Sequence, residues 1–382
     1  MIAMNRPLIT RSGPVRIHFR KGRYSDHDAY GHINTLFLPW LTLDMLRPSL
    51  QVQEVNTGRQ YNILGPSGVV TDDLEGLHAL TDEQGRVVLR SGIEFSLVAY
   101  RGQPSEHSPC VPSLGRLKCP AEQLVALCQS VAFEAVIGEH PYVRLCESVK
   151  FLDSPLFIDK EGLAQHYGLP TDLLDVSNSF DVASFFATSM WDPATRRYLP
   201  VKFSGTPGVM YRVTPTFFML GQSEAAFRDV GWQPLHRPEQ QRAAAFRMKK
   251  GMDFVALPTV QKVLFSHSAK VSTRIWKSFE GGTALFPSDA PAELAERARE
   301  LQGFTRDQID LAWARFDAWH GAVTGLEERQ RLELACGLSV VDAPALTWDG
   351  LDVERDENRL REELNEVLSK VRFRMVSDGL TT

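Results

Sequence analysis

The alternation of apolar and polar residues sets the first part of the chain apart from the rest. Short apolar runs, such as residues 87–89 and 95–98, are separated by turn signals at residues 65–68 and 82–85. This pattern is typical of short strands joined by tight turns. The apolar positions within residues 36–46 instead favour a helix. We therefore expect a β-rich N-terminal region over residues 1–92.

The C-terminal part has the period of amphipathic helices. Residues 305–308 form a capping-box pattern, and Ile309, Trp313 and Phe316 then fall on one helical face. Apolar residues recur at i, i+4, i+7, i+8 and i+11 from Leu360, which gives a second amphipathic helix. We expect a helical module over residues 286–382.

The stretch between these two parts, residues 93–285, mixes both patterns. A strand ends at residues 100–103, and helices are predicted over about 121–137, up to the glycine and proline at 168–170, and over 180–190. Asp159 is positioned to cap the second of these helices. A further strand is expected over residues 254–257. The predicted fold class is therefore α+β, with a mixed central domain between a β-rich region and a helical module.

Composition and charge make this division more informative. The chain has 382 residues, of which 43% are hydrophobic and 23% charged, values typical of a globular protein. The net charge of -5 is unevenly spread, since residues 286–382 carry 12 basic and 20 acidic groups while residues 99–260 carry 16 of each. The neutral central domain can thus accept an anionic ligand, whereas the acidic helices offer a surface on which a partner protein could dock.

The five cysteines and the absence of long apolar stretches bear on the compartment. The cysteine number is odd, and no two form a Cys-x-x-Cys pair. We therefore expect reduced thiols, with neither a disulfide framework nor a metal site. No secretory leader is recognisable, and no stretch approaches the ~18 apolar residues of a membrane span. These features favour a cytoplasmic protein without a membrane anchor.

Two groups of polar residues in the central domain suggest a binding site. Arg101 and Gly102 follow an apolar strand, where a guanidinium can bind two oxygens of a phosphate and a glycine lets that phosphate approach the backbone. Gln165, His166 and Tyr167 then fall in the last turn of a predicted helix, with Thr171 and Asp175 just beyond it. So many polar groups beside apolar leucines require either a buried hydrogen-bond network or a ligand pocket.

These motifs, in their order and spacing, resemble the FRG domain family. The resemblance rests on Tyr100-Arg-Gly-Gln103, on Pro112-Ser-Leu-Gly-Arg116, on the run from Ala164 to Thr171, on Leu173-Leu-Asp175 and on residues 183–187, and covers about residues 93–265. Three features depart from the family pattern. Asp172 replaces an Arg, Val176 replaces a Trp, and residues 237–244 only loosely match a Gln-x-Gly segment. The first two are expected to change the rim of the pocket.

The family's Tyr-Arg-Gly motif is similar to the first motif of ADP-ribosyltransferases, in which the Arg holds NAD. This resemblance implies an enzyme that cleaves the nicotinamide-ribose bond of NAD and transfers ADP-ribose to a protein or nucleic acid, as a bacterial toxin or antiphage defence effector. The catalytic candidates are Arg101, His166, Glu239 and Gln241.

The resemblance also implies which residues bind NAD. They are Arg101, Gly102, Gln165, His166, Tyr167, Thr171, Asp175 and Ser177. The reaction needs a pyrophosphate clamp, an aromatic wall for nicotinamide and a polar group at the ribose. Arg101, Tyr167 and either Glu239 or Gln241 could fill these roles. His166 could bind the ribose or orient Asp175, and Asp175 could equally cap the following helix.

Two other functions are compatible with the sequence. The same pocket could belong to a non-catalytic module that binds a nucleotide or a nucleic-acid end. Alternatively, residues 25–34 resemble the motif of hotdog-fold thioesterases, in which an Asp precedes Gly-His-x-Asn, and this resemblance would make Asp28 the acid for thioester cleavage.

Overall fold

The computed structural model describes residues 84–91, 98–151, 153–202, 205–215 and 225–372, together with five N-terminal strands. Those strands are β1 (Thr35–Phe37), β2 (Leu50–Gln53), β3 (Gln60–Leu64), β4 (Val69–Thr71) and β5 (Leu77–Thr81). The thioesterase-like motif at residues 25–34, including Asp28, lies outside the described residues.

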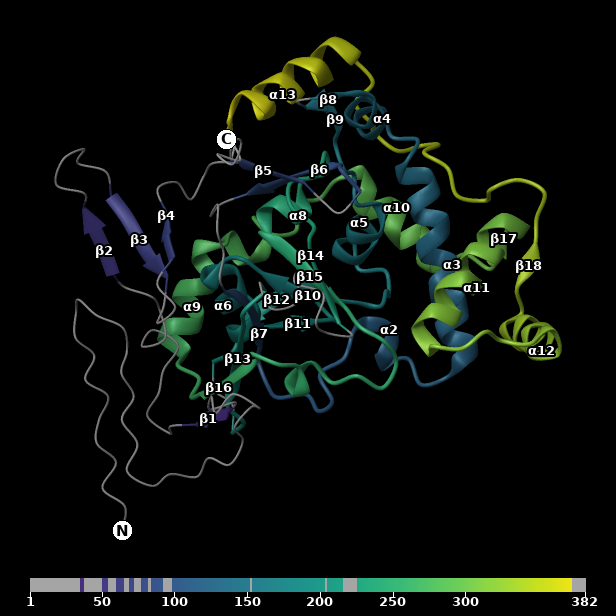
Figure 1. Ribbon diagram of the computed structural model, residues 1–382. Coiled ribbons are helices and arrows are strands. Elements are labelled where there is room, and N and C mark those ends of the chain that lie inside the picture. Colours follow the sequence, from purple (N-terminus) through teal and green to yellow (C-terminus); the bar gives the residue numbers. More distant parts are fainter. Residues whose placement is uncertain are drawn as a thin grey trace, which may run out of the picture.

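A seven-stranded sheet forms the centre of the molecule (Figure 1). Its order is β1, β16 (Gln261–Phe265), β13 (Gly208–Val213), β7 (Ala99–Gln103), β10 (Leu173–Ser177), β15 (Ala243–Arg247) and β14 (Ala226–Asp229). Neighbouring strands are antiparallel except for β1, which pairs in parallel with β16. Side chains of β13 alternate between two cores, as the pleat of a strand requires. Val209 and Tyr211 enter one core, and Met210 enters the other.

Helices α6 (Phe180–Thr188) and α9 (Ala269–Ser278) cover the Met210 face of the sheet. On the opposite side of Figure 1, α3 (Pro120–Ile137) lies beside α10 (Ala290–Arg299) and α11 (Arg306–His320). Helix α3 is buried over most of its circumference because it packs against α11 through Trp313 and Phe316 and also contacts α5 (Lys160–His166). The remaining helices are α2 (Ser113–Arg116), α4 (Pro141–Ser148), α8 (Arg237–Gln240), α12 (Leu326–Cys336), α13 (Glu357–Ser369) and the short η1 (Phe254–Ala256) and η2 (Glu280–Gly282).

Short strands complete the fold. The hairpin of β11 (Ser189–Asp192) and β12 (Arg197–Pro200) follows α6 directly. Strand β5 pairs with β6 (Val87–Ser91) and with β19 (Val371–Arg372). The other pairs are β2–β3–β4, β8 (Lys150–Phe151) with β9 (Ser154–Pro155), and β17 (Gly303–Phe304) with β18 (Ser339–Val340).

The predicted α+β class is confirmed, and three local predictions need correction. Residues 35–37 form strand β1 rather than a helix, because they add to the edge of the central sheet. The helix predicted over 180–190 ends at Thr188, where the β11–β12 hairpin begins. The strand predicted at 254–257 is the helical turn η1, since Asp253 accepts a hydrogen bond from the backbone of Val255 and so caps a turn.

The boundaries near residues 92 and 285 stay predictions, and one hydrophobic core includes side chains from all three predicted regions. Leu77 and Leu89 pack in this core with Leu163 of the central domain and with Leu294 and Leu364 of the C-terminal helices. All five cysteines are free. Among the described residues no single helix is long and apolar enough to cross a membrane, although α3 and α4 together reach that length and composition with a 73° bend between them.

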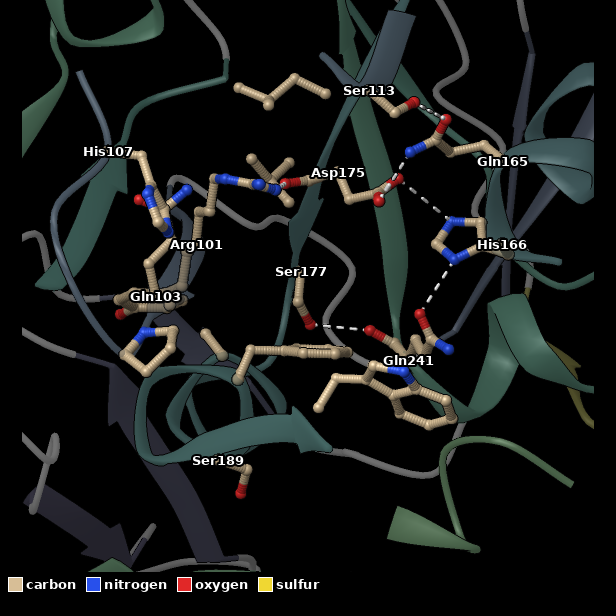
Figure 2. Close-up of a pocket in the computed structure, with 18 of the residues that line it drawn as sticks. Arg101, Gln103, His107, Ser113, Gln165, His166, Asp175, Ser177, Ser189 and Gln241 are labelled. Atoms are coloured by element: carbon tan, nitrogen blue, oxygen red, sulfur yellow. Dashed lines mark hydrogen bonds and ion pairs between the residues drawn. The ribbon is translucent and has the colours of Figure 1, made fainter. Parts of the chain in front are cut away.

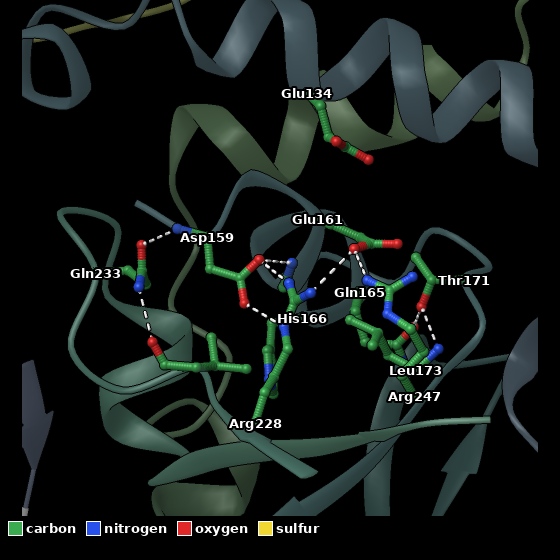
Figure 3. A network of polar contacts seen from close by, with 12 residues as sticks. Glu134, Asp159, Glu161, Gln165, His166, Thr171, Leu173, Arg228, Gln233 and Arg247 are labelled. Atoms are coloured by element: carbon green, nitrogen blue, oxygen red, sulfur yellow. Dashed lines mark hydrogen bonds and ion pairs between the residues drawn. The ribbon is translucent and has the colours of Figure 1, made fainter. Parts of the chain in front are cut away.

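A network of partly buried ion pairs fixes α5 against the sheet (Figure 3). Arg228 on β14 binds Asp159 and Glu161 at the start of the helix, and Arg247 on β15 binds Glu161 and Asp172. Burial would raise the pKa of the Glu161 carboxyl, but Arg247 and Arg228 outweigh it and lower the pKa to about 2. The start of α5 is therefore anchored to two strands, which sets the position of Gln165 and His166 in its last turn.

Candidate functional site

A cavity of about 470 Å³ lies beside strands β7 and β10. The two strands pair at a single position, Ser177 with Tyr100, and residues 100–103 and 173–177 line the cavity. We call it the Arg101 cavity and define it by its lining residues: 100–105, His107, Ser113, Arg116, Gln165, His166, 173–177, Ala183, Phe186, 189–191, Tyr198 and Gln241. Its volume is within the range of small-molecule sites.

Arg101 reaches across from β7 toward β10. Its Nη1 atom donates a hydrogen bond to the backbone carbonyl of Asp175 at 2.5 Å. Among the described residues no carboxylate forms an ion pair with Arg101, and its Nε atom is buried without a hydrogen-bond partner. The guanidinium therefore keeps donors available toward the cavity (Figure 2).

Gln165 links the end of α5 to Asp175 on strand β10. Its Oε1 atom accepts hydrogen bonds from the hydroxyls of Thr171 and Ser113, so its Nε2 atom faces Asp175 and donates to Oδ2 at 2.8 Å. Thr171 also caps the backbone of Leu173 at the start of β10. Gln165 is thus satisfied within the protein, and its role is to hold the carboxylate of Asp175 in place.

Gln241 determines which nitrogen of His166 carries a proton. The Nε2 atom of Gln241 donates to the carbonyl of Leu285 at 3.0 Å, which leaves its Oε1 atom as the partner of His166 Nδ1, also at 3.0 Å. Since a carbonyl oxygen only accepts, Nδ1 of His166 must be the donor. The other ring nitrogen, Nε2, therefore points toward Asp175, as Figure 2 shows.

A gap separates His166 from Asp175. The Nε2 atom of His166 and Oδ1 of Asp175 are 3.9 Å apart, and both atoms are buried without a hydrogen-bond partner within the described part of the chain. This separation exceeds the length of a direct hydrogen bond. Since Nδ1 of His166 carries the ring proton, both facing atoms are acceptors, and each is costly to bury without a donor.

Other lining residues also present unpaired atoms. The Oε1 atom of Gln103 and the hydroxyl of Ser189 are buried without partners in the described part of the chain, as is Nε of Arg101. Buried polar groups in proteins are nearly always hydrogen-bonded, so these atoms call for polar partners, either ordered water or a polar ligand.

The charge of the cavity is weakly positive. Arg101 and Arg116 line it together, and Asp175 is its one carboxylate among the described residues. Loss of hydration and the neighbouring charge of Arg101 lower the pKa of the Arg116 guanidinium, while Cys110 and Asp175 oppose this shift. Two arginines close enough to affect each other favour an anion between them.

Aromatic rings form the remaining wall. Phe186 of α6 and Trp191 and Tyr198 of the β11–β12 hairpin line the cavity. Tyr198 stacks on Phe286, with ring centroids 5.0 Å apart and an angle of 16° between the planes. Trp191 contacts the edge of Tyr198 at 5.3 Å and is 52% exposed.

The structure brings together most of the residues proposed from the sequence. Arg101, Gly102, Gln165, His166, Asp175, Ser177 and Gln241 all line the cavity. Ser177 donates to the carbonyl of Gln241 at 2.8 Å and so joins β10 to the turn after α8. Thr171 lies behind Gln165 and acts on the site only through that residue.

Besides Thr171, two of the proposed residues do not line the cavity. Tyr167 is 1% exposed, and its hydroxyl donates to Asp289 at 2.6 Å while Arg237 lies over its ring. Glu239, two residues before Gln241, is also outside the lining, and burial raises its pKa. Tyr167 therefore does not form an aromatic wall of this cavity, and Glu239 does not supply an acid to it.

Three further expectations are corrected by the contacts. Gly102 lines the cavity, but a Cβ atom on it would lie 1.8 Å from the carbonyl of Ala183, so this glycine allows α6 to pack on β7. Asp175 does not cap α6, since Ser179 accepts the hydrogen bond from Val182 that caps the helix. Asp172 pairs with Arg247 away from the cavity, whereas Val176 lines it.

The residues missed as site components are Arg116, Phe186, Trp191 and Tyr198. Arg116 was part of a family-like segment but carried no signal of its own. Phe186 is one of several apolar residues in a predicted helix, and the two hairpin aromatics lie where that helix is predicted or just after it. The short segment 193–196 between Trp191 and Tyr198 is the signal that could have indicated a hairpin. Among the described residues no group of three His, Cys, Asp or Glu side chains could hold a metal ion.

The fold and cavity define this region as an α+β domain with a partly open site beside strands β7 and β10 of its sheet. The family model of the FRG domain matches residues 96–195 of the chain. The chain therefore carries an FRG domain, which contains Arg101, His166, Asp175 and Trp191, while Tyr198 and Gln241 lie beyond the matched segment. No curated protein and no solved structure matches the chain.

Proposed function

We propose that the Arg101 cavity binds NAD and that the protein cleaves the nicotinamide-ribose bond, passing ADP-ribose to a hydroxyl of a macromolecule or of water. The observation that carries this proposal is the pair of unpaired buried atoms, His166 Nε2 and Asp175 Oδ1, in the same cavity as two arginines. A dinucleotide suits both features, because its ribose hydroxyls can bond the unpaired atoms and its pyrophosphate can bind the arginines.

The residues have distinct tasks in this proposal. Arg101 and Arg116 hold the pyrophosphate, because guanidinium groups bind phosphate oxygens in pairs. Two hydroxyls of one ribose lie beside His166 and Asp175, and each donates its hydrogen to one of the two acceptors, Nε2 of His166 or Oδ1 of Asp175. Gln165 and Gln241 keep these two side chains in position through the contacts described above.

The bond that breaks joins C1 of the ribose to the ring nitrogen of nicotinamide. Both electrons leave with nicotinamide, which becomes neutral and needs no proton. The ribose carbon develops positive charge, as in glycoside cleavage, and the fixed carboxylate of Asp175 stabilises that charge. Attack by the hydroxyl of the acceptor forms the new bond at C1 and releases one proton.

Nicotinamide release from NAD by the purified chain tests this proposal. We expect turnover in the wild type and a loss of about 100-fold or more in Asp175→Asn, since removal of one charge-stabilising group typically has this effect. Asp310→Asn is the matched control, because Asp310 is a surface carboxylate on α11, 61% exposed. Absence of nicotinamide release from the wild type would contradict the enzymatic proposal.

A second function is favoured by one specific observation. Glu239 lies outside the cavity, and Asp175 is the one carboxylate among the described lining residues. A site with so few acidic groups also suits a module that binds a nucleotide or a nucleic-acid end without cleaving it. Saturable NAD binding without nicotinamide release would support this module.

A further inference from the structure

Trp191 is unusual among the surface residues of the protein. It is the one aromatic residue among the exposed large apolar side chains of the described part of the chain, and it lines the Arg101 cavity. An isolated exposed apolar side chain is ordinary, but a half-exposed tryptophan at the wall of a polar cavity provides a flat surface for a ligand ring.

The rings behind Trp191 hold it rigidly. Tyr198, its cross-strand partner in the β11–β12 hairpin, is stacked on Phe286 and contacts Phe186 at 6.2 Å. The carbonyl of Tyr198 accepts a hydrogen bond from the indole of Trp276 on α9 at 2.8 Å. Because Tyr198 is held by these contacts, it gives Trp191 a fixed neighbour on one side. The rest of the Trp191 side chain is accessible to a ligand, since the residue is 52% exposed.

The negative charge of Asp175 acts on this aromatic wall. Burial and the charge of Asp175 raise the pKa of the Tyr198 hydroxyl to about 12, so the carboxylate influences the side of the cavity on which the rings lie. An aromatic face near a carboxylate attracts a cation, because the π-electron face and the carboxylate both favour positive charge.

We infer that Trp191, together with Asp175, selects the oxidised, positively charged nicotinamide ring of NAD+ over the neutral ring of NADH. This inference rests on the proposed function. The nicotinamide of NAD+ is planar and cationic, so its ring stacks on Trp191, while its ribose fills the gap at His166. The dihydronicotinamide of NADH has lost the positive charge and the aromatic planarity, so it gains little from the same wall.

The other face of the hairpin supplies a matched control. Residues paired across a hairpin share a face, so Trp191 and Tyr198 lie on one face, and Met190 and Leu199 on the other. Leu199 is 42% exposed and lies outside the cavity lining. Leu199→Ala therefore perturbs the hairpin without touching the proposed ring site.

The test compares dissociation constants for NAD+ and NADH, measured by stopped-flow mixing before turnover. We expect the wild type and Leu199→Ala to prefer NAD+. We expect Trp191→Ala to weaken NAD+ binding by about 10-fold while leaving NADH binding nearly unchanged, and Trp191→Phe to recover part of the loss. Thermal unfolding of each variant checks that the hairpin is intact.

The inference would be overturned if Trp191→Ala weakened the binding of NAD+ and of NADH by the same factor, or if it weakened the binding of neither. Its failure is distinct from failure of the proposed function. If the affinity for NAD+ depends on Arg101 but not on Trp191, the cavity binds NAD as proposed, but the nicotinamide ring does not stack on Trp191. If neither dinucleotide binds the wild type, both the site and the inference are wrong.

Discussion

The Nε2 atom of His166 lies 3.9 Å from Oδ1 of Asp175, and neither atom has another partner within the described part of the chain. The two side chains come from different elements, α5 and β10, and are held apart by their own hydrogen bonds to Gln241 and Gln165. The gap is therefore built into the fold, and it makes the chemistry of the missing group testable.

The first prediction concerns the ribose hydroxyl that donates to Nε2 of His166. We expect an NAD analogue lacking that hydroxyl to bind the wild type about 10- to 100-fold more weakly, because it leaves a buried acceptor unpaired. His166→Asn keeps a donor for Gln241 but has no Nε2, so in this variant removal of the hydroxyl should weaken binding much less. Titrations of the wild type and the variant, each with NAD and with the analogue, measure this coupling. Equal losses in both proteins would show that the hydroxyl binds elsewhere.

A second prediction concerns the packing of α6 on β7. Gly102→Ala places a Cβ atom 1.8 Å from the carbonyl of Ala183 and 2.7 Å from the amide nitrogen of Ala187. Since backbone atoms cannot yield as a side chain does, the helix must shift, and we expect a loss of about 3 kcal/mol or more in unfolding free energy. Chemical denaturation checks this.

Gly205→Ala is the control for that variant. Gly205 is exposed in a loop, nothing lies within 4 Å of its added Cβ atom, and its φ is not in the left-handed region. It should leave stability within about 0.5 kcal/mol of the wild type. If Gly102→Ala were as stable as this control, the close approach of β7 and α6 would be wrong.

A third prediction follows from His140. This residue is 7% exposed, and its Nδ1 atom accepts a hydrogen bond from the backbone of Tyr142 at the start of α4. Burial lowers the pKa of His140 from 6.5 to about 4, so the unfolded chain binds its proton more readily than the folded one. Its contribution to stability is present above about pH 6.5 and is lost as the pH falls toward 4, by up to about 3 kcal/mol.

His140→Asn isolates this contribution, because asparagine can still cap α4 but does not titrate. We expect the difference in unfolding free energy between wild type and variant to change in favour of the variant as the pH falls from 6.5 to 4. A difference that stayed constant over this range would mean that the folded protein does not exclude the proton from His140.

A fourth prediction tests the ion-pair network that anchors α5. Arg247→Met leaves the carboxylates of Glu161 and Asp172, each 13% exposed, without their shared partner. We expect a loss of about 1–3 kcal/mol, less than for a fully buried pair, because Arg247 is 39% exposed and Glu161 keeps Arg228 as a partner. The loss should be smaller at pH 5 than at pH 8, since the unpaired carboxyl groups can then bind protons.

Arg331→Met is the matched surface control. Arg331 is 73% exposed and pairs with Glu328 one helical turn away, so its removal should cost less than about 1 kcal/mol. A loss in Arg247→Met no greater than in this control would mean that the network does not fix α5.

The sequence was sufficient to predict the α+β class, and several of the residues that it proposed for a site line one cavity. Arg101, His166 and Asp175 could be recognised because they follow regular elements whose ends are marked by glycine, proline and capping residues. The errors have a common cause. Successive residues of a helical turn point about 100° apart, so Tyr167 faces the core next to His166, and Glu239 faces away from the cavity that Gln241 enters.

Tertiary contacts determine the rest, and these could not be predicted from local patterns. Trp191 and Tyr198 reach the cavity because the hairpin after α6 folds back beside it, and Gly102 is required by a helix some 80 positions further along the chain. The gap between His166 and Asp175 likewise depends on Gln241, whose orientation is set by the carbonyl of Leu285. Local propensity carries no information about such pairings.

A calorimetric titration with ADP-ribose tests the central claim most directly, because this ligand has the pyrophosphate and ribose hydroxyls of NAD but no nicotinamide bond to break. We predict saturable binding of one molecule per chain, weakened about 10-fold or more in Arg101→Ala and unchanged in Arg331→Met. The absence of saturable binding, or the same affinity in Arg101→Ala as in the wild type, would contradict the assignment of this cavity as a nucleotide site.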